Sequence, residues 1–262
     1  MSESVQKLNA DLRAAAKTLT TQEARYLVDA YYIIQEDRKR SSNQVRSMKE
    51  EPNEMLRWFF DQNVVLENNI KISLDCFSDA HPVGKWAKSV YGIGPVIAAG
   101  LLAHIDITQA PTVGHIWRFA GLDPSRTWEK GQKRPWNAQL KTLCWHIGQS
   151  FMKFSNRDAC FYGKLYKEKK EFYVAKNDAG DYAERAKTLA PKFSTSTDAY
   201  KHLTAGKLPP AHIDAMARRW VVKLFLSHLH YVWWKDATGE PPPKPYVITH
   251  LGHVHEILPP NI

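Results

Sequence analysis

A short stretch at residues 89–103, SVYGIGPVIAAGLLA, limits the folds open to this chain more than any other. Two glycines one residue apart precede Pro95, and an apolar, alanine-rich run follows. Proline suits the first position of a helix, and glycine permits the positive φ of a tight turn. We therefore expect a short helix, a bend over residues 92–94 and a second helix over 95–104.

This bend suits contact with an anion. Gly92 and Gly94 lack a Cβ, so their backbone can come close to a ligand, while Ile93 would point inward and lock the hairpin. Amides at the start of the next helix would point outward, at the positive end of its dipole. Such a helix-hairpin-helix contacts backbone phosphate without reading bases. The alternative is a turn that only packs two helices closely.

Positive charge is concentrated around this stretch. The net charge of the chain is +9, and residues 81–175 hold 14 Lys and Arg against 6 Asp and Glu. Residues 1–80 are slightly acidic, with 11 against 13, and residues 176–262 hold 11 against 8. Local basicity of this kind favours a polyanionic partner, above all nucleic acid. A basic surface kept only for solubility is the other interpretation.

A second basic cluster lies in RTWEKGQKRPWNAQLK, residues 126–141. Its cations can follow a phosphate backbone while Trp128 offers a ring for stacking. Alternatively, Trp128 and Trp136 are core residues that the cations merely cover. The residues expected to contact nucleic acid are Lys85, Lys88, Gly92, Ile93, Gly94, Arg118, Arg126, Trp128, Lys130, Lys133, Arg134 and Lys141.

The rest of the chain predicts an all-α fold. A capping box at TTQE and a break at Pro52 indicate long amphipathic helices over residues 1–80, as a coiled-coil arm or a three-helix bundle. A basic helix-hairpin-helix domain over 81–175 follows, and then a polar inserted excursion over 176–210. Residues 211–262 give a last strong helix and a Pro-rich strap that packs on the 81–175 domain. Further helices are expected near 84–90, 111–120, 137–153, 158–174 and 210–235.

Composition excludes several classes of protein. No apolar run is long enough for a membrane span, and the N-terminus lacks the apolar core of a signal peptide. Three cysteines without CxxC spacing indicate a reducing compartment and no cysteine-based zinc site. We expect a cytoplasmic, nucleoid-associated protein without a cofactor, and a homo-oligomer formed through the N-terminal helices.

Four motifs in order resemble one family: YGIGPVIAAGLLAHI, RFAGLDPSRTWEKGQKRPWNAQLKTLCW, RDACFYGKLYKEKK and AMARRWVVKLFLSHLHYVWW. They look like the C-terminal transposase domain of insertion-sequence transposases guided by a bridge RNA, over roughly residues 55–236. In that family a RuvC-like domain with an Asp-Glu-Asp-Asp site comes first. The C-terminal domain then carries a Gly-Ile-Gly hairpin, an AGL-P loop and a serine used in strand exchange.

This sequence departs from the family pattern in two places. Its first 80 residues read as helical, with no buried strand ending in Asp, so two-metal cleavage has no evident site. TWEKGQKR also stands where the family has its nucleophilic serine, which leaves Ser125 as a weak candidate. The resemblance therefore implies the nucleic-acid-holding scaffold of a transposase without its chemistry, in a relative from a phage or integrative element.

Other candidate residues lie near the C-terminus. His253 and His255 would share a face of an extended strap and are weak candidates for a metal site, whereas His228 and His230 point apart on a helix. Arg218 and Arg219 could extend the basic surface or form a solvated face. Three functions stay open: a non-catalytic protein that binds DNA or RNA, an active recombinase or nuclease, and an assembly protein whose basic patch meets an acidic protein.

Overall fold

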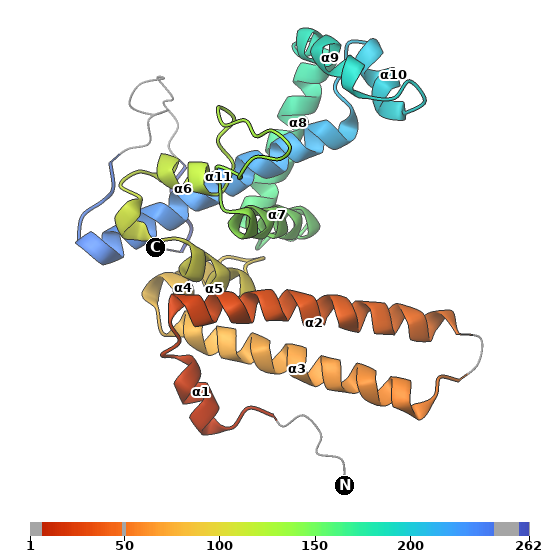
Figure 1. The fold of residues 1–262 in the computed structure, drawn as a ribbon. Coiled ribbons are helices and arrows are strands. Elements are labelled where there is room, and N and C mark those ends of the chain that lie inside the picture. Colours follow the sequence, from red (N-terminus) through yellow and green to blue (C-terminus); the bar gives the residue numbers. More distant parts are fainter. Residues whose placement is uncertain (1–6, 49–50, 244–256, 262) are drawn as a thin grey trace.

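The computed structural model describes residues 7–48, 51–243 and 257–261, and over these it is all-α (Figure 1). The prediction of an all-α fold is confirmed: the described residues form α-helices and two short 3-10 helices, without a strand. The α-helices are α1 (Ala10–Ala16), α2 (Thr21–Ser47), α3 (Glu54–Asp79), α4 (Pro82–Ser89), α5 (Pro95–His104), α6 (Val113–Phe119), α7 (Ala138–Lys153), α8 (Phe161–Asp178), α9 (Ala183–Leu189), α10 (Asp198–Thr204) and α11 (Pro210–Thr238).

Helices α2 and α3 form an antiparallel arm that projects from the rest of the molecule (Figure 1). The capping box predicted at TTQE opens α2: the Thr20 hydroxyl accepts from the Glu23 amide, and the Glu23 carboxylate accepts from the Thr20 amide. At the base of the arm, the Arg25 Nε donates to the carbonyl of Ala103 in the last turn of α5. The arm is therefore fastened to the helix that follows the Gly-Ile-Gly bend.

Helix α5 occupies the centre of the molecule, between the arm and α7. It is apolar all round, and nearly all of its side chains are buried. A helix without a polar face has to be covered on every side. That explains why the alanine-rich run follows the bend directly: small side chains let four neighbouring helices, α2, α3, α4 and α7, pack closely on one short helix.

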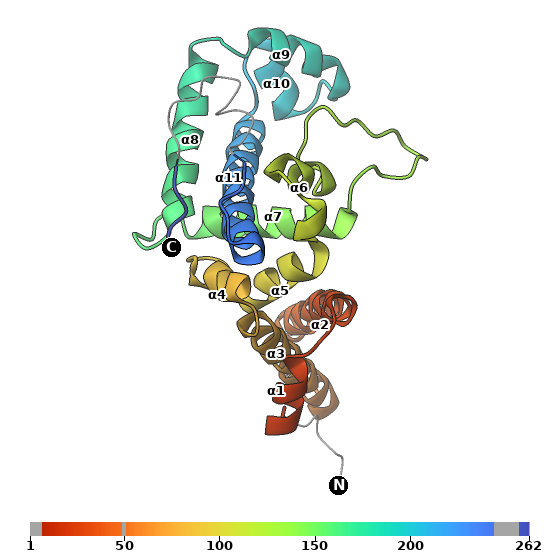
Figure 2. The same cartoon turned by 90° about the vertical axis from the view of Figure 1, so that its left-hand side faces the viewer.

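Helices α6, α7, α8 and α11 form the second half of the core (Figure 2). The long α11 packs along α8 and crosses α7, α6 and α4. Aromatic rings fill the junction: Phe151 of α7 stacks on Tyr162 of α8 at 4.8 Å between ring centroids, and Phe225 of α11 meets both rings edge-on. This junction fixes α7, whose two ends carry the candidate site.

The segment over 176–210 packs with the start of α11 around a small second hydrophobic core, formed by Ala186, Leu203, Leu208 and Ile213. The side chain of Asn177, in the last turn of α8, fixes the end of this segment: it donates to the Leu208 carbonyl at 3.0 Å and accepts from the Leu208 amide at 2.8 Å. Helices α9 and α10 therefore sit at the start of α11 (Figure 2).

The final described residues, 257–261, reach back across the molecule. His228 Nε2 donates to the Ile257 carbonyl at 2.7 Å, and Trp86 Nε1 donates to the Pro260 carbonyl at 3.0 Å. The Asn261 side chain donates to the Ser89 carbonyl at 3.1 Å. These contacts tie α4 to α11. Among the described helices, none has the length and apolar character needed to cross a membrane.

Candidate nucleic-acid interface

The Gly-Ile-Gly bend connects α4 to α5 and follows the predicted pattern. The Ile93 amide donates to the Val90 carbonyl at 3.0 Å, and the Ile93 side chain is buried. Gly92 has a φ of +100°, a conformation that side chains other than glycine rarely adopt. Pro95 then starts α5. The first glycine is therefore required by the backbone itself.

The two glycines have different surroundings. Gly92 faces α7: the Ser150 hydroxyl donates to its carbonyl, and a Cβ at Gly92 would lie 3.2 Å from Ser150 Oγ and 3.4 Å from the Phe151 ring. A Cβ at Gly94 would have no heavy atom within 4 Å. One side of the bend is thus closed by α7, and the other is open at Gly94.

Helix α5 begins without a side-chain cap. Pro95 has no N–H, and no hydrogen bond among the described residues uses the amide of Val96 or Ile97; the first amide in use is that of Ala98, which donates to the Gly94 carbonyl. Free amides at a helix N-terminus carry partial positive charge. These two unused donors directly follow Pro95 and the open position at Gly94.

Among the predicted cations at the bend, Lys85 and Lys88 differ. Lys85 is exposed, whereas the Lys88 ammonium lies 2.5 Å from Asp75 and 2.7 Å from Asp79, both on α3. Lys88 therefore fastens α4 to the arm and has its charge balanced within the protein. Sequence reasoning could not foresee these partners, because they lie on a helix that precedes the hairpin.

Two aromatic side chains next to the bend were missed by the sequence analysis. Tyr91 and Phe154 meet edge-on at 5.3 Å between ring centroids, with 41% and 38% of their surfaces exposed. Two exposed cations lie on either side of Phe154 in the sequence, Lys153 at the end of α7 and Arg157 just after it. The signal available in the sequence was the aromatic residue immediately before the first glycine.

The basic loop runs from the end of α6 to the start of α7, and the Asn137 amide closes it by donating to the Phe119 carbonyl at 2.9 Å. Trp128 is 38% exposed; its Nε1 donates to the Gln132 carbonyl, and the Arg134 guanidinium lies 5.3 Å from its ring centroid. The loop's predicted nucleic-acid contacts are all exposed: Arg126, Trp128, Lys130, Lys133 and Arg134.

The second tryptophan of the loop has a packing role. Trp136 lies against Gly121, whose φ is +65°, and the Lys141 ammonium sits 4.0 Å from the Trp136 ring centroid. Arg118 is exposed on α6, with its Nε 3.7 Å from Asp123 Oδ2. Trp136 thus anchors the loop, while Trp128 remains accessible for stacking.

Ser125 closes a turn in the same loop. Its amide and its hydroxyl both donate to Asp123 Oδ1, at 2.9 and 2.8 Å. These hydrogen bonds, together with the charges of Arg118 and Lys223, hold the pKa of Asp123 below its usual range. The hydroxyl is exposed, and its hydrogen-bond partner is an ionised carboxylate.

The hairpin and the basic loop lie at opposite ends of α7. Gly92 contacts Ser150 and Phe151 near the C-terminal end, whereas the loop joins the helix at Asn137. At 1.5 Å per residue, the intervening 13 residues correspond to about 20 Å. A ligand that contacts both regions has to span that distance, as a polymer can.

Residues 85–162 match the model of the IS116/IS110/IS902 transposase family. This transposase-family segment begins on α4, contains the hairpin, α5, α6, the basic loop and α7, and ends near the start of α8. The predicted resemblance to a transposase C-terminal domain is thereby confirmed for this segment. The arm and most of α8 to α11 lie outside it. No curated protein and no solved structure matches the chain.

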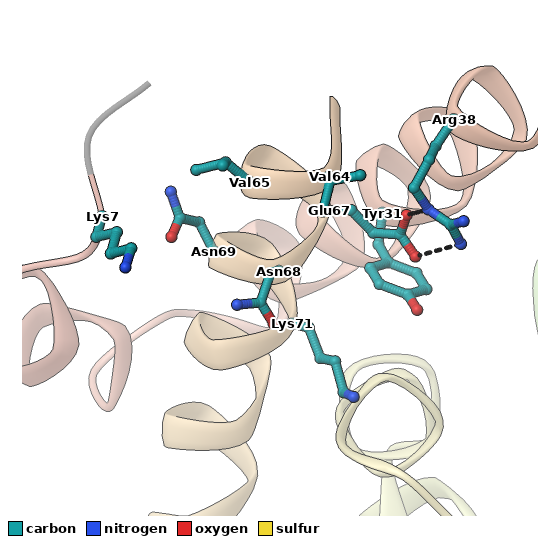
Figure 3. Close-up of a pocket in the computed structure, with 9 residues that line it drawn as sticks. All are labelled: Lys7, Tyr31, Arg38, Val64, Val65, Glu67, Asn68, Asn69 and Lys71. Carbon is teal, nitrogen blue, oxygen red and sulfur yellow. Dashed lines mark hydrogen bonds and ion pairs between the residues drawn. The ribbon is translucent and has the colours of Figure 1, made fainter. Parts of the chain in front are cut away.

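A hollow outside the transposase-family segment lies along the arm, and its lining includes Lys7, Tyr31, Arg38, Glu67 and Lys71 (Figure 3). Arg38 forms an ion pair with Glu67 across α2 and α3, and Gln35 also donates to this carboxylate. Burial raises the pKa of Glu67, but these hydrogen bonds outweigh it and hold the pKa below its usual range. Glu67 therefore serves the packing of the arm.

Two histidines of α11, His228 and His230, also have structural partners. His228 accepts from the Tyr162 hydroxyl at 2.7 Å, in addition to its bond with the strap, and His230 Nε2 donates to the Ala110 carbonyl at 2.8 Å. The metal candidates His253 and His255 lie outside the described residues. Elsewhere in the described chain, no three His, Cys, Asp or Glu side chains gather in a way that could hold a metal ion.

Proposed function

We propose that this transposase-related protein binds DNA through backbone phosphates, largely independently of sequence and without cutting it. One observation carries the proposal: the uncapped amides of Val96 and Ile97 stand behind a bend that is open at Gly94. Helix N-termini with free amides bind phosphate readily. The match of this segment to a transposase family supports a nucleic acid as the source of that phosphate.

The basic loop supplies the second contact. Its four cations, Arg126, Lys130, Lys133 and Arg134, are exposed, and no ion pair in the described chain balances them. Each Lys or Arg placed on a phosphate releases counterions, so affinity falls as salt rises. Trp128 adds a ring that every base can stack on. These features support contact with the backbone in preference to base reading.

The use of Ser125 supports a non-catalytic function. Its hydroxyl and amide together close the turn on Asp123. TWEKGQKR follows, where the family resemblance leads us to expect the nucleophilic serine. In the proposed function, the protein holds DNA without cutting it, and another factor cleaves or joins the strands.

Fluorescence anisotropy with labelled duplex DNA, single-stranded DNA and RNA tests this proposal. Four loop cations on phosphates give a slope of log affinity against log salt of about −3.6, so binding should weaken by roughly 150-fold between about 50 and 200 mM salt. Lys133→Gln with Arg134→Gln should reduce the slope by about 2. Lys39→Gln with Arg40→Gln removes the same charge from the arm as a control. Wild-type protein that binds none of the probes would refute the proposal.

A recombinase or nuclease is the second candidate function. The observation in its favour is that the exposed Ser125 hydroxyl lies 2.8 Å from a carboxylate. Incubation of supercoiled plasmid with Mg²⁺ or Mn²⁺ distinguishes the two functions. Nicking that disappears in Ser125→Ala would establish strand chemistry at this loop, whereas intact plasmid under both metals would remove this candidate.

We further propose that the arm joins two copies of the chain. Large apolar side chains are exposed toward the start of α3, at the far end of the arm: Met55, Leu56, Trp58, Phe59, Val64 and Leu66. Exposed apolar groups in this density mark interaction surfaces more often than solvent-facing helices. Light scattering should give twice the chain mass for the wild type and the single chain mass for Trp58→Glu with Phe59→Glu. An unchanged mass in that variant would refute the proposed dimer.

A further inference from the structure

One face of α11 carries three cationic or titratable side chains in a row. They are His212, Arg219 and Lys223; Arg219 follows His212 by 7 residues, and Lys223 follows it by 11. At about 3.6 residues per turn, they point within about 40° of one another and extend over about 16 Å. Lys223 is held in place by Trp117, with its ammonium 4.1 Å from the ring centroid.

The excursion brings a further cation to this row. Ala186 of α9 is fully buried in the small core beside Ile213 of α11, so α9 packs on the first turns of α11. Arg185, next to Ala186, acts electrostatically on both His212 and Arg219. A segment that reads as a polar insertion thus contributes an exposed guanidinium to a surface formed by another helix.

The transposase-family segment brings cations from the opposite side. Lys141, near the start of α7, interacts electrostatically with both Arg134 of the basic loop and Arg219 of α11. Lys141 therefore links the charges of the row on α11 with those of the basic loop. We call this set the α11 stripe: Arg185, His212, Arg219, Lys223, Lys141 and Arg134.

Little negative charge balances the α11 stripe. Asp214 of the same helix is engaged by Tyr166, Lys170 and Arg218. Asp123 acts on Lys223 at the far end of the row. Burial and the charges of neighbouring arginines lower the pKa of His212 and of Arg219. Like charges this close repel one another, and an anion would relieve that repulsion.

A buried nitrogen provides a second, independent observation. His212 Nε2 is inaccessible to solvent and has no hydrogen-bond partner among the described residues. Buried polar atoms of side chains are nearly always paired, and each exception calls for an explanation. This one lies in the row, beside two arginines.

We propose that the α11 stripe binds a run of backbone phosphates and so extends the path of a nucleic-acid strand from the basic loop toward the excursion. This inference rests on the proposed function and adds a third contact region to it, beside the bend and the basic loop. The length of the row favours a polymer over a single ion, because about 16 Å corresponds to roughly five phosphates of one strand at 3.4 Å each. The excursion thereby acquires a role in binding.

Matched substitutions on one helix test this proposal. Arg185→Gln removes a cation of the stripe, and Lys187→Gln removes one from the same helix about 200° away. Arg219→Gln tests the centre of the row, with its folding checked by thermal unfolding. With a labelled duplex DNA probe, Arg185→Gln and Arg219→Gln should each reduce the salt slope by about 1, and Lys187→Gln should leave it unchanged.

The outcomes separate this inference from the proposed function. If both stripe variants keep the wild-type slope while Lys133→Gln with Arg134→Gln loses part of it, the stripe does not bind phosphates and the proposed function stands. If Lys187→Gln weakens binding as much as Arg185→Gln, net charge explains the effect and the stripe is refuted. If the wild type binds no nucleic acid, both proposals fail together.

Discussion

Replacing the second glycine of the bend should raise stability and lower affinity at once. Gly94 is the N-cap of α5, has an ordinary φ of −93°, and has open space where a Cβ would lie. Asparagine is a favoured N-cap whose side chain bonds the amide of the second or third helical residue. In Gly94→Asn, that side chain would occupy the amide of Val96 or Ile97, the groups proposed to hold phosphate.

The two effects differ in size. Exchange of glycine for asparagine at an N-cap stabilises a helix by a few tenths of a kcal/mol. Loss of one hydrogen bond to a charged group costs about 1.5–3 kcal/mol, which is roughly a 10- to 150-fold loss of affinity. Gly92→Ala is the comparison: its φ of +100° and the nearby Ser150 Oγ predict a loss of about 1–3 kcal/mol in unfolding free energy.

Thermal unfolding and anisotropy titrations on the same preparations measure both quantities. A change of 1 kcal/mol shifts the Tm of a chain of this size by about 2–4 °C, so Gly92→Ala should melt clearly below the wild type. Gly94→Asn should melt at or slightly above it. If Gly94→Asn binds duplex DNA with wild-type affinity at the same salt concentration, the amides at the start of α5 do not hold phosphate.

Three further predictions concern stability. Burial lowers the pKa of His228 from 6.5 to about 4. The unfolded chain therefore takes up a proton at this histidine before the folded chain does, so the free energy of unfolding should fall as the pH drops from 6.5 toward 4, by at most about 3 kcal/mol. A free energy of unfolding that stays constant over this pH range in urea titrations would contradict this. Trp86→Phe removes the hydrogen bond to Pro260 and should cost about 1 kcal/mol, and an unchanged Tm would show that the strap does not stabilise α4. Arg38→Ala leaves the Glu67 carboxylate without its ion pair, so amide hydrogen exchange should accelerate in the arm but not in α7. An equal change of exchange rate in the arm and in α7 would refute a local role.

The sequence predicted the elements whose signals are local. Pro95 at the start of α5, the capping box of α2 and the break near Pro52 each depend on a few adjacent residues, and the structure has all three. The apolar run after the bend likewise indicated a helix, and the structure has it as α5. In these places the physical cause of the structure lies within one or two turns of chain.

Features that depend on distant partners could not be predicted. Lys88 looked like a free cation beside the bend, but two carboxylates of α3 balance its charge. Arg185 and Arg219 are more than 30 residues apart in the sequence, and their charges act on each other only because α9 folds back beside the start of α11. The roughly 20 Å between bend and loop follows from the length of α7, and no motif in either segment encodes it.

The bond between Arg25 and the Ala103 carbonyl has a mechanical consequence. Because α5 packs against the arm on one side and against α7 on the other, a tilt of α2 and α3 would also shift α5 and the amides at its start. Strain applied at the far end of the arm would therefore reach the bend some 40 Å away, since the 26 residues of α3 correspond to about that length. The arm and the Gly-Ile-Gly turn are therefore mechanically coupled through α5.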